Sequence, residues 1–237
     1  MLFCSLFLLM ACEKETENTS SILHFELKGD VRMMVSLGTS YEEPGYMVTY
    51  KNEDVSKNVQ VLGSVDVKTV GIYHLDYIYT NADGVKTTRS REIIVADPSV
   101  KTDISGKYTG IEGTQRLSNG KVIPYPGFTV TIKKIAPGFF QISDFLGGYY
   151  AQRAGYGNSY ACSGYIQLKN DNSLTLLSNS LPGWGDSLSA LNDAVCEPEK
   201  GNVSWKAEYA GMIFTVILKN TNKQHEESFI YYLLCCV

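Results

Sequence analysis

The sequence has few charged residues and only a small excess of negative charge. Lysine and arginine number 21 against 25 aspartates and glutamates, which gives a formal net charge of −4, and charged residues make up 19% of the chain. A nucleic-acid-binding surface needs a basic stripe, so this balance argues against nucleic acid as a partner. After the first twelve residues, no apolar run is long enough to span a bilayer.

Catalytic and metal-binding motifs are also scarce. The chain has three histidines, none in an i, i+4 pair and none beside a cysteine at metal-ligand spacing. It has no glycine-rich phosphate loop and no dinucleotide fingerprint. We therefore predict no catalytic residue, no metal and no cofactor. Tryptophan is rare, at two residues, whereas the 16 tyrosines and 21 glycines are typical of β-structure with many turns.

The first twelve residues are apolar and end in a cysteine. The run is too short to span a membrane as a mature helix, and Leu9-Met10-Ala11-Cys12 resembles the lipobox of bacterial lipoproteins. In that family the cysteine is diacylated and becomes the mature N-terminus, and two or three acyl chains give stable anchoring. The resemblance implies that residues 1–11 are a signal peptide and that lipid on Cys12 is the only membrane contact. A truncated secretory signal with a chance cysteine is the alternative.

Residues 12–21 are the predicted lipid anchor and tether. From Glu13 to Ser21 the chain is polar and has no apolar periodicity, as in a flexible linker. A lysine among acidic residues just after the lipidated cysteine resembles the surface-export signal of Bacteroidetes lipoproteins. This resemblance implies attachment to the outer membrane, facing the cell exterior, whereas the alternative is an ordinary solvated linker.

In the segment 22–97, apolar and polar residues alternate in short stretches that are separated by residues typical of turns. We expect strands at residues 23–27, 33–37, 45–50, 59–63, 71–79 and 86–95. The segment Asn81-Ala82-Asp83-Gly84 predicts a hairpin turn, because Asp-Gly tolerates positive φ. Short strands at regular spacing in about 75 residues predict a small sandwich.

The order of motifs in this region resembles a known family. Five segments match a bacterial surface immunoglobulin-like repeat in type and order: Gly38–Gly45, Glu53–Ser56, Val67–Tyr73, Asn81–Gly84 and Arg91–Asp97. The resemblance implies an immunoglobulin-like sandwich that acts as a spacer or accessory binding unit and has no catalytic role.

A second all-β domain is predicted over residues 104–237, after a polar linker at residues 98–103. Its opening, Gly106-Lys107-Tyr108-Thr109-Gly110, resembles the first strand of lipocalin-like barrels. Further strands are expected at residues 128–135, 138–144, 165–168, 174–177, 202–209, 212–218 and 228–234. Only residues 188–194 suggest a short helix. Roughly eight strands predict either an antiparallel barrel of lipocalin or calycin type or a sandwich.

Three segments of the second domain carry another resemblance. Ile142–Tyr150, Gly155–Gly157 and Leu181–Ser187 resemble the uncharacterised C-terminal domain of two-domain Bacteroides surface lipoproteins. The two resemblances together imply an accessory lipoprotein of the kind associated with polysaccharide-utilisation systems. Such a protein would capture an oligo- or polysaccharide for an outer-membrane importer, so the glycan and importer components are the expected partners.

The candidate ligand-binding residues are mainly aromatic, because sugar rings present apolar faces that suit aromatic rings. Trp184 lies between two glycines in a turn that would expose the ring. The glycine-rich stretch Gly147–Gly164 contains four tyrosine candidates: Tyr149, Tyr150, Tyr156 and Tyr160. The alternative is that Trp184 closes one end of a barrel and that half of the tyrosines face inward. The other tryptophan, Trp205, lies in an alternating strand and is predicted to be in the core.

Two carboxylates complete the candidate set. Asp144 and Asp186 lie in the two most distinctive loops and are interpreted as ligand-binding residues. A glycoside hydrolase needs two carboxyl groups at a fixed separation, but both residues could instead cap turns. We predict a non-catalytic glycan-capturing lipoprotein. A structural or protein-docking lipoprotein is the main alternative, and a glycosidase is a further one.

Two of the cysteines could form a disulfide. A protein of the cell envelope folds in an oxidising compartment, and Cys162 and Cys196 lie within the second domain. Spacing alone does not establish the bridge, so this pairing is a hypothesis.

Overall fold

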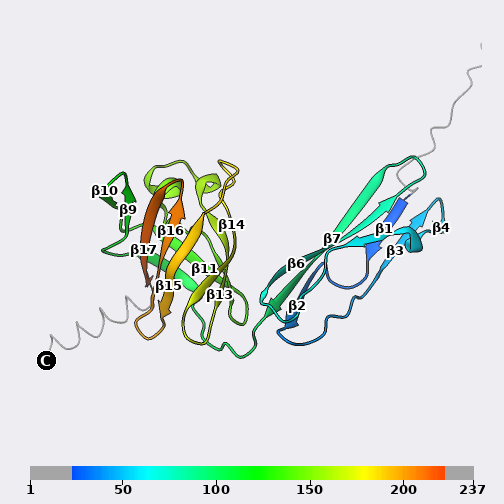
Figure 1. Ribbon diagram of the computed structural model, residues 1–237, viewed down its shortest axis with the longest axis horizontal. Coiled ribbons are helices and arrows are strands. Elements are labelled where there is room, and N and C mark those ends of the chain that lie inside the picture. The colour runs from blue at the N-terminus through cyan, green and yellow to red at the C-terminus, as the bar shows by residue number, and fades with distance from the viewer. Residues whose placement is uncertain (1–22, 222–237) are drawn as a thin grey trace, which may run out of the picture. The chain divides into compact units, whose positions relative to one another are not determined.

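The computed structural model describes residues 23–221 (Figure 1). Packing divides them into two compact units, one formed by residues 23–31, 43–62 and 76–90, the other by residues 32–42, 63–75 and 91–221. Within residues 23–221, no helix is both long and apolar enough to cross a membrane. The predicted signal peptide, Cys12, the tether at residues 12–21 and the strand expected at residues 228–234 lie outside the described residues.

The N-terminal part of the chain forms two sheets, as its period-two pattern predicts. The first is antiparallel and has the order β1 (Leu23–Leu27), β3 (Tyr46–Tyr50), β4 (Glu53–Asp54). The second has the order β2 (Arg32–Ser36), β7 (Lys86–Ala96), β6 (Gly71–Thr80), β5 (Gln60–Leu62). Strand β2 runs parallel to β7, and a 3₁₀ turn, η2, covers Ser56–Asn58.

Tyrosines join the two sheets within the first unit. The rings of Tyr46 on β3 and Tyr77 on β6 have centroids 5.2 Å apart, and those of Tyr50 and Tyr79 are 6.1 Å apart. The predicted hairpin turn between β6 and β7 is confirmed: Gly84 has a φ of +79° and its N–H donates to the carbonyl of Asn81 at 3.0 Å. The sandwich prediction thus holds for these strands.

The C-terminal sheet contains ten strands and curls strongly into an antiparallel half-barrel (Figure 1). Its strands are β8 (Gly106–Gly110), β9 (Gln115–Ser118), β10 (Lys121–Pro124), β11 (Thr129–Ala136), β12 (Phe139–Ile142), β13 (Ser163–Leu168), β14 (Leu174–Ser180), β15 (Ala190–Glu197), β16 (Asn202–Tyr209) and β17 (Met212–Asn220). Two short turns of helix interrupt them, namely the π-turn η3 (Tyr149–Arg153) and the 3₁₀ turn η4 (Asn158–Tyr160).

The strand order shows how the half-barrel curls. Eight strands follow one another as β15, β16, β17, β8, β11, β12, β13 and β14, and the β9–β10 hairpin adds to β17. The two ends of the curl come together just before β14, where Ser173 forms an isolated bridge with Val195 of β15 and the N–H of Cys196 donates to the carbonyl of Asn172 at 2.9 Å. The sequence had allowed a barrel or a sandwich, and the curled sheet is of the barrel type.

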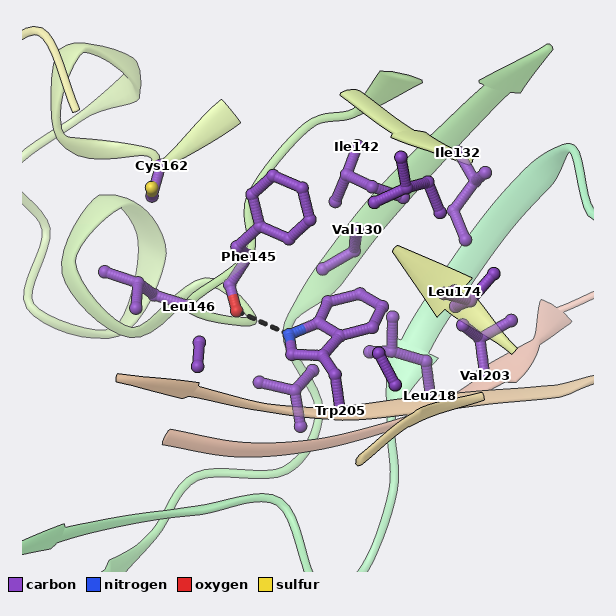
Figure 2. Packing of buried hydrophobic residues seen from close by; sticks show 14 of the residues in the cluster. Val130, Ile132, Ile142, Phe145, Leu146, Cys162, Leu174, Val203, Trp205 and Leu218 are labelled. Carbon is purple, nitrogen blue, oxygen red and sulfur yellow. Dashed lines mark hydrogen bonds between the residues drawn. The ribbon is translucent and has the colours of Figure 1, made fainter. Parts of the chain in front are cut away.

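Trp205 lies at the centre of the main core, as its alternating strand predicted. Its side chain is 2% exposed, and its indole Nε1–H donates to the carbonyl of Phe145 at 2.7 Å (Figure 2). Val203 and Leu218 are also fully buried in this cluster, together with side chains from β11, β12 and β13. Burial of alternate residues on β8, β11, β13, β16 and β17 explains why the sheet curls around one apolar interior.

Two details of the C-terminal sheet differ from the sequence prediction. The short helix expected at residues 188–194 is wrong, because Ala190–Glu197 is strand β15 and pairs with β16. A register shift between Asn192 and Val195, with Asp193 at a φ of +50°, breaks the period-two burial and imitates a helical spacing. The hairpin β9–β10 was not predicted.

Candidate functional site

A tight turn presents Trp184 to solvent. The turn is closed by a bridge between Leu181 and Asp186, with the Leu181 N–H donating to the Asp186 carbonyl at 2.7 Å. The N–H of Gly183 donates to a backbone carbonyl of η4 at 2.6 Å, and Gly185 has a φ of +63°. Trp184 is 44% exposed at the tip of this turn, as its position between glycines predicted.

Four tyrosines surround Trp184, and we call these five residues the aromatic cluster: Tyr150, Tyr156, Tyr160, Trp184 and Tyr209. The rings of Tyr150 and Tyr160 both meet Trp184 edge-on, with centroids 4.8 Å away. Tyr209 stacks on Trp184 at 6.2 Å, and Tyr156 lies 6.1 Å away. Edge-to-face and offset geometries at these distances are favourable for aromatic pairs, so the rings support one another.

The rings of the cluster differ in access to solvent. Tyr156 is 55% exposed and, with Trp184, forms the open side of the cluster. Tyr150 and Tyr160 are half-buried, and Tyr209 is buried. Tyr149, predicted from the same stretch, is buried beneath Tyr150, with centroids 5.0 Å apart. The structure therefore brings Tyr150, Tyr156, Tyr160 and Trp184 together at the surface and places Tyr149 below them.

Asp144 shapes the turn that begins η3. Its carboxylate accepts hydrogen bonds from the N–H groups of Leu146 (2.9 Å), Gly148 (3.1 Å) and Cys162 (3.1 Å). The side chain is 2% exposed. Burial raises the pKa of Asp144 to about 6, against the opposing effect of these three hydrogen bonds. Gly148 has a φ of +85°, and an added Cβ there would lie 2.6 Å from Phe128, so this turn requires glycine.

Asp186 lies in a different environment from Asp144. It is exposed, and its carboxylate accepts the N–H of Ser187 at 2.7 Å. Burial raises the pKa of Tyr209, and the negative charge of Asp186 and a hydrogen bond to it raise this pKa further. Asp186 is therefore at the edge of the aromatic cluster, whereas Asp144 is buried under backbone N–H groups.

Two arginines that sequence reasoning missed lie against Tyr149. The guanidinium carbon of Arg116 is 4.7 Å from the centroid of the Tyr149 ring, and that of Arg153 is 5.1 Å away. Arg116 is on β9, directly opposite the buried Phe214 of β17, so its side chain points to the inner face of the sheet. Arg116 owes this orientation to the pairing of β9 with β17, which joins distant segments of the chain, so no local sequence signal marked it.

A polar pocket adjoins the same two helical turns. It has a volume of about 440 Å³ and is lined by the outer faces of β11, β12 and β13 together with side chains of η3 and η4. Its polar lining residues are Thr131, Lys133, Gln141, Ser143, Asp144, Gln152, Asn158 and Ser163. Gln152 also holds η3 to β11, because its side-chain amide Nε2 donates to the carbonyl of Thr129 at 2.7 Å.

Cys162 and Cys196 are buried free thiols. The disulfide that the sequence allowed is therefore not formed. Cys162 precedes β13 and its sulfur lies 3.6 Å from the side-chain oxygen of Asn179, whereas Cys196 is an inward residue of β15. Burial raises the pKa of Cys162 to about 12 and that of Cys196 to about 11. Within residues 23–221, no group of three or more histidine, cysteine, aspartate or glutamate residues could hold a metal ion.

Two family models match the chain. Residues 25–95 match a bacterial surface protein, Ig-like domain, and residues 97–220 match a C-terminal-domain family. A crystal structure of the lipoprotein BT2262 from Bacteroides thetaiotaomicron is 40% identical, covers 84% of this chain and 100% of its own, and has a TM-score of 0.49. The chain belongs to the family of this lipoprotein. The resemblance of residues 22–97 to a bacterial surface immunoglobulin-like repeat and that of the second domain to the C-terminal domain of a Bacteroides lipoprotein are thereby confirmed. Membership indicates a surface lipoprotein with an immunoglobulin-like domain.

Two other solved structures, both of Clostridium perfringens ZmpB, are much more distant. One contains CBM51-2 in complex with GlcNAc and INT domains, with 16% identity, 55% of this chain and 34% of that chain covered, and a TM-score of 0.27. The other contains the M60 catalytic domain with CBM51-1 and CBM51-2, with 16% identity, 47% and 13% coverage, and a TM-score of 0.25. No match was found among curated proteins.

Proposed function

We propose that this chain is a non-catalytic surface lipoprotein that captures a glycan at the aromatic cluster. The observation that carries the proposal is the exposure of Trp184 and Tyr156 beside the supporting rings of Tyr150 and Tyr160. A large aromatic side chain is normally buried, and here a hydrogen-bonded turn holds one outward. Such a site offers a ring face to the apolar face of a sugar.

The surroundings of the cluster suit a sugar better than an apolar ligand. The carboxylate of Asp186 lies at one edge, and the tyrosine rings bring hydroxyl groups to the same region. These groups are hydrogen-bonding partners for sugar hydroxyls, while the rings cover the C–H faces. Ligand sites combine aromatic walls with a few polar groups in this way.

The environment of Asp144 supports a function without catalysis. A glycosidase needs two carboxyl groups that flank the scissile bond. The carboxylate of Asp144 is instead bonded to three backbone N–H groups and is 2% exposed. Asp144 thus has the role of ordering the turn before η3, and Asp186 alone does not make a hydrolytic pair.

The proposal includes the cellular setting that the sequence suggested. Lipid on Cys12 would anchor the chain in the outer membrane, and the polar residues 12–21 would serve as a tether facing the exterior. The immunoglobulin-like domain would act as a spacer, and captured glycan would pass to an outer-membrane importer. The similarity to a lipoprotein supports the proposed lipid anchor on Cys12.

Affinity electrophoresis tests glycan capture. The chain from residue 13 to residue 237 is run through native gels that contain a panel of polysaccharides, beside Trp184→Ala and Trp184→Phe. We expect retardation by at least one glycan, weakened about tenfold by Trp184→Ala because ring stacking is lost, and partly retained by Trp184→Phe. Retardation that is unchanged in Trp184→Ala would move the site away from the cluster. A panel without any retardation would overturn glycan capture.

A protein-docking lipoprotein is the second candidate, because one apolar strip crosses three strands. Val122 on β10 is opposite Leu117 on β9, and Leu117 is opposite Ile213 on β17. Their exposed fractions are 47%, 37% and 36%. An importer subunit with an apolar contact surface would fit this strip. Co-purification with importer subunits that is lost in Leu117→Lys and kept in Trp184→Ala would favour docking.

A further inference from the structure

Arg116 is a partly buried cation at an inward-facing position. It shares the inner face of the sheet with Phe214, which is fully buried, and its guanidinium lies over the ring of Tyr149. Its Nε is buried and has no hydrogen-bond partner among the described residues. A charge removed from water is costly unless it is paired. Among the described residues its guanidinium meets the Tyr149 ring and the Tyr150 hydroxyl but no carboxylate, so an anion would be a favourable further partner.

Arg153 adds a second positive charge next to the same ring. It is the exposed last residue of η3, and its guanidinium carbon is 5.1 Å from the Tyr149 centroid. Within residues 23–221, neither Arg116 nor Arg153 forms an ion pair. Both guanidinium groups lie against the Tyr149 ring, so an anion near that ring would be attracted by both charges.

The arginine pair is continuous with the aromatic cluster. Tyr149 contacts Tyr150 edge-on at 5.0 Å, and Tyr150 in turn contacts Trp184 at 4.8 Å. Arg116 also acts on Tyr150 directly: its positive charge and a hydrogen bond favour ionisation of the Tyr150 hydroxyl, although burial outweighs them and raises the pKa. A sugar on Trp184 would thus have cationic groups on the Tyr150 side and the carboxylate of Asp186 on the Tyr209 side.

We infer that the glycan captured at the aromatic cluster is acidic, and that Arg116 and Arg153 bind its carboxylate or sulfate groups. This inference rests on the proposed function and names its ligand class. A neutral hydroxyl could accept a hydrogen bond from a guanidinium but would leave the charge unbalanced, whereas carboxylate and sulfate oxygens do both. Because the chain has a formal net charge of −4, its overall field does not favour polyanions, and retention has to come from this local pair.

Calorimetric titration with matched acidic and neutral probes tests the inference. Oligogalacturonate is compared with its methyl ester, and dextran sulfate oligomers with dextran oligomers, so that carboxylate and sulfate are distinguished. The protein is the chain from residue 13 to residue 237, with Arg116→Gln, Arg153→Gln, Trp184→Ala and the control Arg89→Gln, which removes one exposed positive charge from β7.

We expect at least one acidic probe to bind about tenfold more tightly than its neutral partner, with affinity falling as salt rises. Arg116→Gln and Arg153→Gln should each reduce that affinity about tenfold and weaken the salt dependence, and Arg89→Gln should change neither. Arg153 is exposed, so its variant keeps the test valid if Arg116→Gln fails to fold.

The outcomes separate this inference from the proposed function. Equal binding of acidic and neutral probes that is lost in Trp184→Ala, but unchanged in both arginine variants, would overturn the acidic ligand and leave glycan capture standing. Acidic binding that depends on the arginines and not on Trp184 would support the anion site and count against the aromatic platform. If no acidic probe binds, the inference is wrong.

Discussion

Both tryptophans of the chain belong to the C-terminal sheet and its turns, and both contact other aromatic rings, but their surroundings differ. Trp205 is 2% exposed, packs edge-on against Phe145 at 5.9 Å and donates its indole N–H to a backbone carbonyl. Trp184 is 44% exposed and contacts four tyrosines of the aromatic cluster. One region keeps its aromatic side chains inside, and the other presents them at the surface.

Backbone context explains the difference. Trp205 is an inward position on β16, where burial alternates along the whole strand. Trp184 is in a turn of a few residues that is fixed by backbone hydrogen bonds, and Gly183 packs so closely on Tyr160 that an added Cβ would lie 2.7 Å from its ring. A core is specified by periodicity, whereas a surface cluster of rings is specified by turns and glycines.

Replacement of the two tryptophans should give the largest contrast. Trp205→Ala should lower the free energy of unfolding by about 3–5 kcal/mol, because it removes a fully packed ring and leaves the Phe145 carbonyl without its donor. Trp184→Ala should lower it by less than about 1 kcal/mol. Urea unfolding measures both values, with Trp205→Phe as the control that keeps a ring. Similar losses for the two alanine variants would mean that the aromatic cluster is part of the core.

Asp144→Asn should have an intermediate effect, since Asp144 joins the core to the turn before η3. The asparagine amide would place its N–H groups against backbone N–H donors. We therefore expect the free energy of unfolding, measured with urea, to fall by about 1–3 kcal/mol. In the folded chain the pKa of Asp144 is raised to about 6, above the ordinary value of about 3.9. The contribution of the protonated Asp144 side chain to the free energy of unfolding is therefore complete below about pH 4. It is lost as pH rises through about 6.

The stability difference between the chain and Asp144→Asn should therefore narrow from pH 4 to pH 7. Asp171 provides a control of opposite sign, because hydrogen bonds with Ser173 lower its pKa. Its contribution is present above the ordinary pKa and is lost as pH falls, so the difference from Asp171→Asn should widen with rising pH. The same pH dependence in both variants would show that Asp144 is not buried in solution.

The smallest expected effect concerns the two buried cysteines, which should not react with an alkylating reagent in the folded chain. Burial raises the pKa of Cys162 to about 12 and that of Cys196 to about 11, so almost no thiolate is present at pH 8. Iodoacetamide should leave both thiols unmodified in the folded chain and modify both in urea, as measured by peptide mass spectrometry. Modification of either thiol at the unfolded rate under native conditions would place it at the surface.

Most strands could be predicted from the sequence, because the alternation of apolar and polar residues and the presence of turn residues are local signals. The strand at residues 202–209 and the hairpin turn at residues 81–84 were predicted where they occur. The β9–β10 hairpin has few buried side chains, so it lacks the apolar alternation that marks a strand. Strand β15 was missed because its register shift disguises the alternation.

The candidate site was only partly accessible to the same reasoning. Glycines on both sides of Trp184 signalled an exposed ring, and the structure places Tyr150, Tyr156 and Tyr160 around it. The depth of Tyr149 and the approach of Arg116 depend on contacts between distant strands. Pairing between strands that are distant along the chain cannot be predicted from a single sequence. Asp144 was recognised as distinctive, but its bonds to backbone N–H groups depend on the folded turn, which also brings Cys162 to the carboxylate.

The meeting point of β14 and β15 gives the half-barrel a line of mechanical weakness. Neighbouring strands elsewhere in the curl share ladders, as β16 and β17 do along their whole length. Strand β15 is joined to the β14 side by one isolated bridge and the adjacent Asn172–Cys196 hydrogen bond, both at the residues just before β14. Few backbone bonds have to break there for the strands to part. Thermal fluctuations should therefore open the wall along this line first, and water should reach the interior from that side.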